Sequence, residues 1–291
     1  MNNKSINPHN VTQLIKGSEI AQHIIAGIAS EISQKHISPH LVIFLVGDNP
    51  ASVQYVSMKE KRAKEAGIKC TILQFATDIP EDSLIELIAE MNENSAVSGI
   101  MIQLPLPEEI SAKKVLDFVA PEKDVDGLSS LSLGKIIFGT STFVPAVCKG
   151  IMTMISKERI SLVGKDVTVI GNSASFGMPL SILLSQKGAT VTICHDKTKN
   201  LDEHVLYADI IITAAGVPDL ITGKMIKKGA IIIDGGTALN KKTGRIVGDV
   251  AFDSVQGIAA KVSPVPGGVG PMTIASLLEQ TLLAYKNQHK N

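Results

Sequence analysis

Short apolar runs of strand length alternate with amphipathic helical patterns along almost the whole chain. "HLVIFLVG" (40–47), "KCTILQF" (69–75) and "SGIMIQLPLP" (98–107) are separated by segments with helical periodicity. Continuous apolar runs of this length are typical of strands that are covered on both faces of a sheet. The alternation therefore predicts an α/β fold with a mainly parallel sheet.

The first half of the chain predicts one compact unit of three strands with their connecting helices. Helical patterns cover residues 17–35, 50–66, 80–94 and 110–120. Asn49 suits the cap of the second of these helices, Pro50 its first turn and Gly67 its end. Residues 121–145 are less regular, and a helix at 146–157 leads into the second half.

The second half begins with a strand, a glycine-containing turn, a helix and a strand, in "KDVTVIGNSASFGMPLSILLSQKGATVTICHD". Two further strands are expected in "ADIIITAAG" (208–216) and "GAIIIDGG" (229–236), with a short one near 257–262. The chain ends in an apolar helix at 272–286. This order is typical of a dinucleotide-binding unit.

Length and composition exclude several classes of protein. The 291 residues suit two domains of ordinary size. Lys+Arg and Asp+Glu number 28 each, so no charge imbalance indicates a nucleic-acid partner. The cysteines, at 70, 148 and 194, lack metal-ligand spacing and favour buried thiols in a reducing compartment. No apolar run reaches the ~20 residues that span a membrane, and the polar N-terminus lacks a signal core. We therefore expect a soluble, cytoplasmic protein without a metal.

The turn "VIGNSASFG" follows a buried strand and opens a helix, which is the setting in which backbone N–H groups hold a pyrophosphate. Its spacing, with Gly171 and Gly177, departs from the usual G-x-G-x-x-G, and a plain strand–helix turn is the alternative. Asp196 follows the next strand, where a carboxylate favours NAD over NADP. A simple turn at Asp196 is the other interpretation, and Lys197 or Lys199 would attract a phosphate instead.

Tyr55 and Lys59 stand four residues apart on the helix after "VGDNPAS", so they share one face. Most lysines on such a helix only face water. A Tyr-x-x-x-Lys pair also occurs in short-chain dehydrogenases, but there it follows the glycine turn within one domain. Here the pair lies more than 100 residues before Gly171, which argues against that family.

Other polar residues stand at strand ends and turns. Gln103 follows a buried strand, and ligands of open α/β sheets bind beyond the carboxyl ends of strands. "KDVDG" places Asp124 and Asp126 in a turn that lacks the further ligands of a calcium loop. "PVPGGVGP" (264–271) combines three glycines with three prolines, and such bare backbone allows a flat ligand to approach closely.

Taken together, "VGDNPAS", "YVSMKEKRAKEAGI", "GIMIQLPLP", "PEKDVDGL", "GDVAFD" and "PVPGGVGPMT" resemble the bifunctional methylenetetrahydrofolate dehydrogenase/methenyltetrahydrofolate cyclohydrolase (FolD) family, from about residue 14 to residue 285. The resemblance implies two α/β domains with a cleft between them. It assigns residues 1–147 and 272–291 to a catalytic, folate-binding domain and residues 148–271 to a Rossmann-like NAD(P)-binding domain. It implies a homodimer that oxidises 5,10-methylenetetrahydrofolate with NAD(P) and hydrolyses the methenyl product to 10-formyltetrahydrofolate.

The resemblance also implies residue roles. Lys59 is the acid–base group of the hydrolysis, Gln103 positions it, Tyr55 stacks along the folate rings and Asp126 binds the pterin edge. The implied substrate-binding set comprises Tyr55, Lys59, Gln103, Leu104, Asp126, Pro266, Gly267 and Gly268. The implied cofactor-binding set comprises Gly171, Asn172, Ser173, Asp196 and Thr237.

The sequence departs from the family pattern on the cofactor side and at the bridging helix. Pro145-Ala146-Val147-Cys148 replaces Pro-x-Thr-Pro, and "DGGTALN" (234–240) replaces Asp-Val-Gly-Ile-Asn. Asn172 and Asp196 also differ from the common pattern. NADP is expected from the resemblance and NAD from Asp196. A member with cyclohydrolase activity alone, a non-catalytic folate-binding paralogue and a two-domain dehydrogenase of a small acid remain as alternatives.

Overall fold

The computed structural model describes residues 11–239 and 244–290 of the chain. This part divides into two compact units. Unit 1 contains residues 11–20 and 150–272, and unit 2 contains residues 21–149 and 273–290. The boundaries fall inside three helices, α1 (Gly17–Lys35), α6 (Ala146–Lys157) and α10 (Val269–Gln288).

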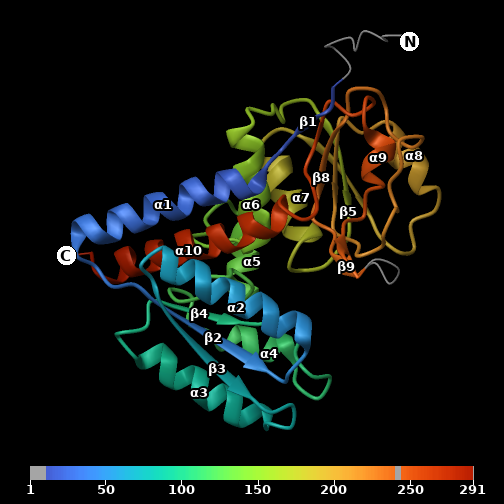
Figure 1. Ribbon diagram of the computed structural model, residues 1–291. Coiled ribbons are helices and arrows are strands. Elements are labelled where there is room, and N and C mark those ends of the chain that lie inside the picture. The colour runs from blue at the N-terminus through green and yellow to red at the C-terminus, as the bar shows by residue number, and fades with distance from the viewer. Residues whose placement is uncertain (1–10, 240–243, 291) are drawn as a thin grey trace. The chain divides into compact units, whose positions relative to one another are not determined.

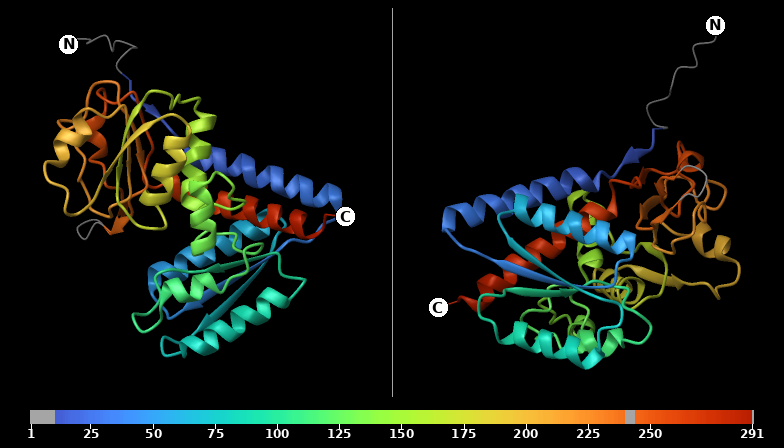
Figure 2. Two further views of the ribbon diagram at one scale, coloured as in Figure 1. Left: turned by 180° about the vertical axis from the view of Figure 1, so that it is seen from behind. Right: turned by 60° about the horizontal axis from the view of Figure 1, so that its bottom comes forward.

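A parallel three-stranded sheet in the order β3-β2-β4 forms the centre of unit 2. Helix α2 lies on one face of this sheet, and α3 and α4 lie on the other (Figures 1 and 2). Successive side chains of each strand point to opposite faces of the sheet. Phe44 and Ile100 point to the α3 and α4 face, where they pack with Leu84 of α3 and Val115 of α4. The elements of unit 2 are β2 (His40–Val46), α2 (Pro50–Glu65), β3 (Lys69–Phe75), α3 (Glu81–Glu93), β4 (Gly99–Ile102), α4 (Ala112–Asp117) and α5 (Ser130–Ile137).

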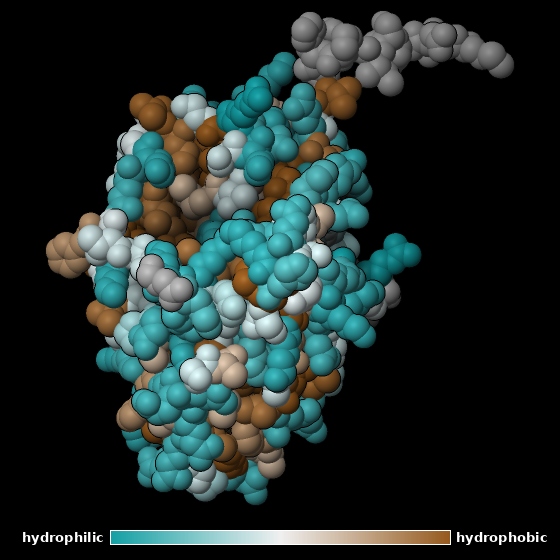
Figure 3. Space-filling model, turned by 90° about the vertical axis from the view of Figure 1, so that its left-hand side faces the viewer, coloured by the Kyte–Doolittle hydropathy of each residue, from teal (hydrophilic) through white to brown (hydrophobic). Residues whose placement is uncertain are grey.

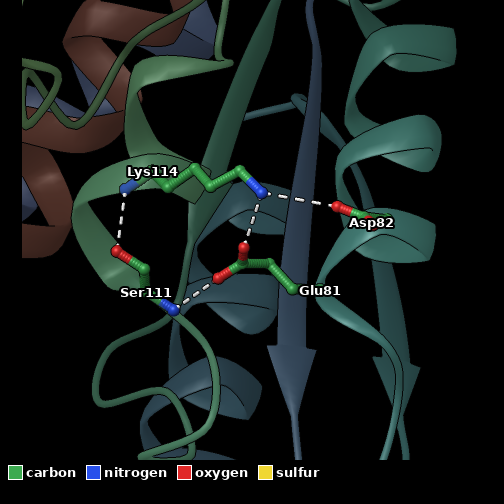
Figure 4. A network of polar contacts seen from close by, with 4 residues as sticks. All are labelled: Glu81, Asp82, Ser111 and Lys114. Carbon is green, nitrogen blue, oxygen red and sulfur yellow. Dashed lines mark hydrogen bonds and ion pairs between the residues drawn. The ribbon is translucent and has the colours of Figure 1, made fainter.

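A polar network joins the starts of α3 and α4 on the outer side of this layer (Figure 4). The Glu81 carboxylate accepts hydrogen bonds from the Ser111 backbone N–H and from Lys114 Nζ, both at 2.7 Å. The Ser111 hydroxyl caps α4 by accepting from the Lys114 backbone N–H at 3.3 Å. Lys114 also lies 3.4 Å from a carboxylate oxygen of Asp82. These contacts fix the register of the two helices through exposed groups and the half-buried Glu81.

A parallel six-stranded sheet in the order β1-β11-β8-β7-β5-β6 forms the centre of unit 1. Helices α8 and α9 cover one face, and α7 lies on the other (Figure 1). The elements are β1 (Gln13–Leu14), β5 (Asp166–Ile170), α7 (Gly177–Gln186), β6 (Thr190–Cys194), α8 (Leu201–Leu206), β7 (Ile210–Thr213), β8 (Ile231–Asp234), β9 (Ala238–Leu239), β10 (Ile246–Val247), α9 (Phe252–Val255) and β11 (Lys261–Val262). Strands β9 and β10 form a separate antiparallel pair.

The fold class predicted from the sequence is confirmed: the chain is α/β, with a parallel sheet at the centre of each unit. Two details differ from the expectation. Residues 11–20 belong to unit 1, not to the first domain, because β1 pairs with β11. The stretch expected to be irregular contains α5, where the Ser129 hydroxyl caps the helix by accepting from the Ser132 backbone N–H at 3.2 Å.

The surface and the helices give two further facts. Hydrophilic side chains cover most of the face in Figure 3, and the hydrophobic ones lie in small groups. Over residues 11–239 and 244–290, no helix has both the length and the apolar character needed to cross a membrane.

Candidate active site

Helix α2 places Tyr55 and Lys59 on one face, as their spacing predicts. The helix begins where Asn49 Oδ1 accepts from the backbone N–H groups of Ala51, at 3.0 Å, and Ser52, at 3.3 Å. The Lys59 nitrogen lies 4.4 Å from the centroid of the Tyr55 ring, which is cation–π contact distance. The lysine is 2% exposed, so it does not simply face water.

Strand β4 and Gln103, the residue that follows it, supply two acceptors to the same nitrogen. Residues 101 and 103 are two apart, so their side chains point to the same side of the strand, toward α2. Lys59 Nζ donates to Gln103 Oε1 at 2.8 Å and contacts Met101 Sδ at 3.3 Å. The Gln103 amide nitrogen donates to the Leu104 carbonyl oxygen at 2.6 Å, which fixes the direction of Oε1. The structure thus brings Tyr55 and Lys59 of α2 together with Gln103, which lies 44 residues after Lys59 in sequence.

The surroundings of Lys59 favour its neutral form. Burial lowers the pKa of the Lys59 ammonium from its ordinary 10.5 to about 8, while the negative charge of Asp126 opposes that change. Its partners Gln103 and Met101 are neutral. A lysine with such a pKa exists in both protonation states near neutral pH, as an acid–base group requires.

The segment that carries Asp126 runs alongside β4. The Ile100 backbone N–H donates to the Lys123 carbonyl at 2.8 Å. Gln280 of α10 donates to the Val125 carbonyl at 2.7 Å and so holds the segment from the other side. Burial raises the pKa of the Asp126 carboxyl to about 6, opposed by the nearby Lys59 charge. Asp126 is therefore close enough to Lys59 for each charge to shift the other's pKa.

The two aspartates of "DVDG" have different environments. The Asp124 carboxylate accepts from the Ser129 hydroxyl and the Ser132 hydroxyl, both at 2.6 Å, and from the backbone N–H of Leu128 at 3.2 Å. Through these bonds the Asp124 carboxylate holds the turn and the start of α5. Asp126 is left as the aspartate that interacts with Lys59.

Tyr55 is held from a second side by α10. Burial raises the pKa of the Tyr55 phenol to about 12, the charge of Asp126 adds to this, and a side-chain hydrogen bond with Thr273 opposes it. The phenol therefore stays neutral in the physiological range. Its ring presents a flat, uncharged face beside Lys59.

In unit 1, the glycine turn after β5 has the bare backbone that a dinucleotide phosphate needs. Gly171 has a φ of +117°, and a Cβ on Gly177 would lie 1.6 Å from the Gly171 carbonyl oxygen. No side chain caps α7 at Phe176. Asn172 and Ser173 are exposed in the turn. The residues of this turn fit a dinucleotide phosphate at the N-terminus of α7.

Asp196 and Thr237 follow the ends of β6 and β8, at the edge of the sheet where the glycine turn also lies. The Asp196 side chain is 75% exposed and forms an ion pair with Lys197 at 2.8 Å. Thr237 is exposed. Among residues 11–239 and 244–290, no group of three or more His, Cys, Asp or Glu side chains could hold a metal ion.

The loop containing Pro266, Gly267 and Gly268 also lies in unit 1. Part of its bare backbone serves packing: a Cβ on Gly17 would lie 2.0 Å from the Gly268 carbonyl oxygen, and the Ser18 backbone N–H donates to Gly267 at 2.8 Å. Gly267 has a φ of +108°, and a Cβ there would meet nothing closer than 3.8 Å. The space beside the Gly267 Cα is therefore not filled by packing, unlike the space beside Gly268.

The predicted site residues thus fall into three groups. Tyr55, Lys59, Gln103, Leu104 and Asp126 lie together in unit 2. The glycine turn with Asp196 and Thr237, and the 266–268 loop, lie in unit 1. Sequence reasoning missed two contacts, that of Met101 with Lys59 and that of Thr273 with Tyr55. Strand alternation would have found Met101, whereas no local pattern identifies Thr273.

Comparison with known proteins identifies the family. The catalytic-domain model of the tetrahydrofolate dehydrogenase/cyclohydrolases matches residues 15–126, and their NAD(P)-binding-domain model matches residues 145–289. The chain belongs to the tetrahydrofolate dehydrogenase/cyclohydrolase family. The family resemblance seen in the sequence is therefore confirmed.

Full-length relatives agree with this family. The bifunctional protein FolD of Brevibacillus brevis is 43% identical over 281 residues, covering 95% of this chain and 98% of the relative. That of Thermodesulfovibrio yellowstonii is 44% identical over 281 residues, covering 96% and 98%. The Campylobacter jejuni FolD crystal structure is 39% identical with a TM-score of 0.92, covering 95% of this chain and 99% of that one. The Trypanosoma brucei FolD structure, complexed with NADP cofactor and inhibitor, is 32% identical with a TM-score of 0.92, covering 97% and 99%.

The predicted activity class is confirmed with the family. The chain is a bifunctional methylenetetrahydrofolate dehydrogenase and methenyltetrahydrofolate cyclohydrolase of one-carbon metabolism, with an NAD(P)-binding domain.

Proposed function

We propose that Lys59 is the acid–base group of the hydrolysis half-reaction. The observation that carries this proposal is a lysine that is 2% exposed, bound to Gln103 at 2.8 Å and shifted to a pKa of about 8. An ordinary lysine, with a pKa of about 10.4, is almost fully protonated near neutrality and is a poor base. The cationic methenyl substrate would lower the Lys59 pKa further by charge repulsion.

The reaction follows from that placement. The neutral Lys59 amine accepts a proton from the water that adds to the methenyl carbon of 5,10-methenyltetrahydrofolate. The carbon–N5 bond then breaks, N5 takes up a proton, and the formyl group stays on N10. Gln103 holds the amine in position through its side-chain oxygen. Each turnover releases one proton, because a cation and water give a neutral product.

The remaining residues of the site bind the folate. The uncharged face of Tyr55 offers a stacking surface for the ring system. Asp126, held beside β4, accepts hydrogen bonds from the N–H groups of the pterin edge. Leu104 and the loop of Pro266, Gly267 and Gly268 complete the substrate-binding set.

The dehydrogenase half requires a nicotinamide dinucleotide, which takes the hydride from the methylene bridge when it is bound. Gly171, Asn172 and Ser173 would hold its phosphates at the start of α7, and Thr237 would contact it at the end of β8. We infer that Asp196 makes NAD the preferred cofactor, because an exposed carboxylate at that strand end repels a 2′-phosphate. The opposing inference, that the enzyme accepts NADP, rests on Lys197. This lysine is paired with Asp196 and would lower the repulsion between the carboxylate and the 2′-phosphate.

A paired assay tests the function directly. Dehydrogenation of methylenetetrahydrofolate is followed with NAD and with NADP at equal concentration, and hydrolysis is followed by the loss of methenyl absorbance. Lys59→Met should abolish hydrolysis while the circular dichroism spectrum stays unchanged. Lys61→Met is the matched control, since Lys61 is exposed on the same helix. Hydrolysis by Lys59→Met at the wild-type rate would refute the role of Lys59.

The same assay addresses the second candidate function, a cyclohydrolase with a weak dehydrogenase half. The departures at residues 145–148 and 234–240 favour it, because they lie on the cofactor side and at the bridging helix. Hydrolysis that is much faster than dehydrogenation with either cofactor would support that function. A homodimer stays a prediction, which sedimentation equilibrium would check.

A further inference from the structure

Met101 contacts the nitrogen on which the proposed hydrolysis depends. Its sulfur lies 3.3 Å from Lys59 Nζ, and its side chain is 5% exposed. It stands on the same side of β4 as Gln103, whose oxygen lies 2.8 Å from the same nitrogen. One strand face thus presents two acceptors, a thioether sulfur and an amide oxygen, to one lysine.

The two acceptors match the hydrogen-bonding capacity of a neutral amine. An ammonium has three N–H donors, whereas a neutral amine has two N–H donors and one lone pair. With Gln103 and Met101 each taking one N–H, the neutral nitrogen keeps its lone pair in the third direction. The same contacts in the ammonium form leave one N–H in that direction. The position that gains or loses a proton is therefore fixed in space by the strand.

We propose that Met101 is a positioning residue for the cyclohydrolase reaction: with Gln103 it takes up two N–H bonds of Lys59 and leaves the third position of that nitrogen for water and substrate. The proposal rests on the proposed role of Lys59. It adds that the thioether acts as a hydrogen-bond acceptor as well as filling space.

The chemistry of sulfur explains why a methionine suits this position. A thioether is a weak acceptor, so it orients an N–H without stabilising the ammonium as an amide oxygen or a carboxylate does. The titratable groups that face Lys59 are Asp126 from the segment beside β4, Cys70 from β3 and Tyr55 from α2. Asp126 favours the charged lysine. Burial raises the pKa of the Cys70 thiol to about 11, so this thiol is neutral where Lys59 titrates. A strong acceptor in place of Met101 would stabilise the ammonium more than the thioether does.

Two substitutions of Met101 separate its role as a hydrogen-bond acceptor from its role in filling space. Met101→Leu keeps the volume and removes the acceptor, so the fold should tolerate it. We expect kcat for methenyl hydrolysis to fall roughly fivefold, the effect of one lost hydrogen bond, with KM unchanged within about twofold. The pH–rate midpoint should fall by roughly half a unit, because the ammonium loses a partner. Met101→Gln offers an oxygen acceptor and should move the midpoint the opposite way.

A readout independent of turnover is the titration of Lys59 itself. The ¹⁵Nζ resonance of Lys59, assigned by its loss in Lys59→Met, should shift its midpoint in Met101→Leu in the same direction as the pH–rate profile. Met91→Leu is the matched control, since Met91 lies on α3 and packs against the core of the same unit. It should leave both the titration and kcat unchanged.

The possible failures are distinguishable. If Met101→Leu has the wild-type kcat, pH profile and ¹⁵Nζ titration while Lys59→Met is inactive, Met101 only fills space and the inference is wrong. If Lys59→Met still hydrolyses the methenyl compound, the proposed function fails and the positioning role fails with it.

Discussion

The carboxylate of Asp234 accepts a hydrogen bond from the backbone N–H of Asp249, at 3.1 Å. The Asp249 carboxylate in turn accepts from the Thr213 hydroxyl and the Ala215 backbone N–H, both at 2.6 Å, and from the Val217 N–H at 2.8 Å. Both aspartates are buried. Together they tie the loops that follow β7 and β8 at the strand ends where open α/β sheets bind ligands.

Asp249→Asn should destabilise unit 1 by about 3 kcal/mol, because the amide loses a buried charge that three donors solvate. Its NH₂ group would also face at least one N–H donor. Urea unfolding measures the loss, and faster hydrogen exchange at Ala215 and Val217 locates it. Asp253→Asn, at an exposed site on α9, is the control and should leave both measurements unchanged. Wild-type protection at Ala215 in the Asp249 variant would contradict the assignment.

Gly236, which precedes β9, packs directly against the carboxylate of Asp249. A Cβ on Gly236 would lie 2.2 Å from Cγ of Asp249. Gly236→Ala should therefore cost about 2 kcal/mol in the free energy of unfolding, by overpacking a buried carboxylate. Gly27→Ala in α1 is the opposite case, since a Cβ there meets nothing within 4 Å. It should stabilise the protein by about 0.5–1 kcal/mol, as alanine does in a helix interior. Equal effects of the two substitutions would show that Gly236 is not constrained by Asp249.

Local patterns were sufficient to predict α2, with its Asn49 cap and its end before Gly67, and to place Tyr55 and Lys59 on one face. The strand end marked Gln103 as a candidate, but its association with Lys59 was expected only from the family resemblance; the structure places the two 2.8 Å apart. The sequence could not predict β1, because a two-residue strand is defined only by its pairing with β11, more than 240 residues away. Helix α5 was missed for a similar reason: its start depends on Asp124, which binds two serines of a polar stretch.

The site was predicted less completely than the helix that carries it. Motif residues were found because each has a side chain whose chemistry stands out in its segment. Met101 was not, since in sequence it is one apolar residue in a buried strand. Asp234 stood at the end of an expected strand and Asp249 in the family segment "GDVAFD", and neither carboxylate was given a role. Their carboxylates bind backbone N–H groups of other loops, and such groups are the same for every residue type except proline. The sequence therefore does not reveal these bonds.

Cofactor choice can be tested at one exposed position. Asp196→Ser should raise kcat/KM with NADP relative to NAD by roughly tenfold, because it removes a negative charge that repels a 2′-phosphate. It also frees Lys197 from its ion pair. Steady-state rates with both cofactors check this, and Asp202→Ser on α8 is an exposed control. A wild-type enzyme that already strongly prefers NADP would refute the role of Asp196.

The pKa of Lys59 predicts a pH dependence of stability as well as of rate. Burial lowers this pKa from 10.5 to about 8 in the folded protein. Between pH 8 and pH 10.5 the unfolded chain therefore binds more protons at this residue than the folded one, and stability rises with pH. Below pH 8 the penalty of burying the ammonium is present in full and constant. The total change corresponds to about 3 kcal/mol.

Lys59→Met isolates this contribution, because methionine does not titrate. The free energy of unfolding of the wild type minus that of the variant should rise steadily above pH 8. A separate change is expected near pH 6, because the variant also loses the Lys59 charge that lowers the pKa of Asp126. Urea unfolding at fixed ionic strength measures both proteins, and Lys61→Met provides a flat reference, because Lys61 is exposed. A difference that stays flat up to pH 10 would mean that the folded protein does not depress the Lys59 pKa. Lys59 would then be too basic to take a proton from water near neutrality, and the proposed acid–base role would lose its physical basis.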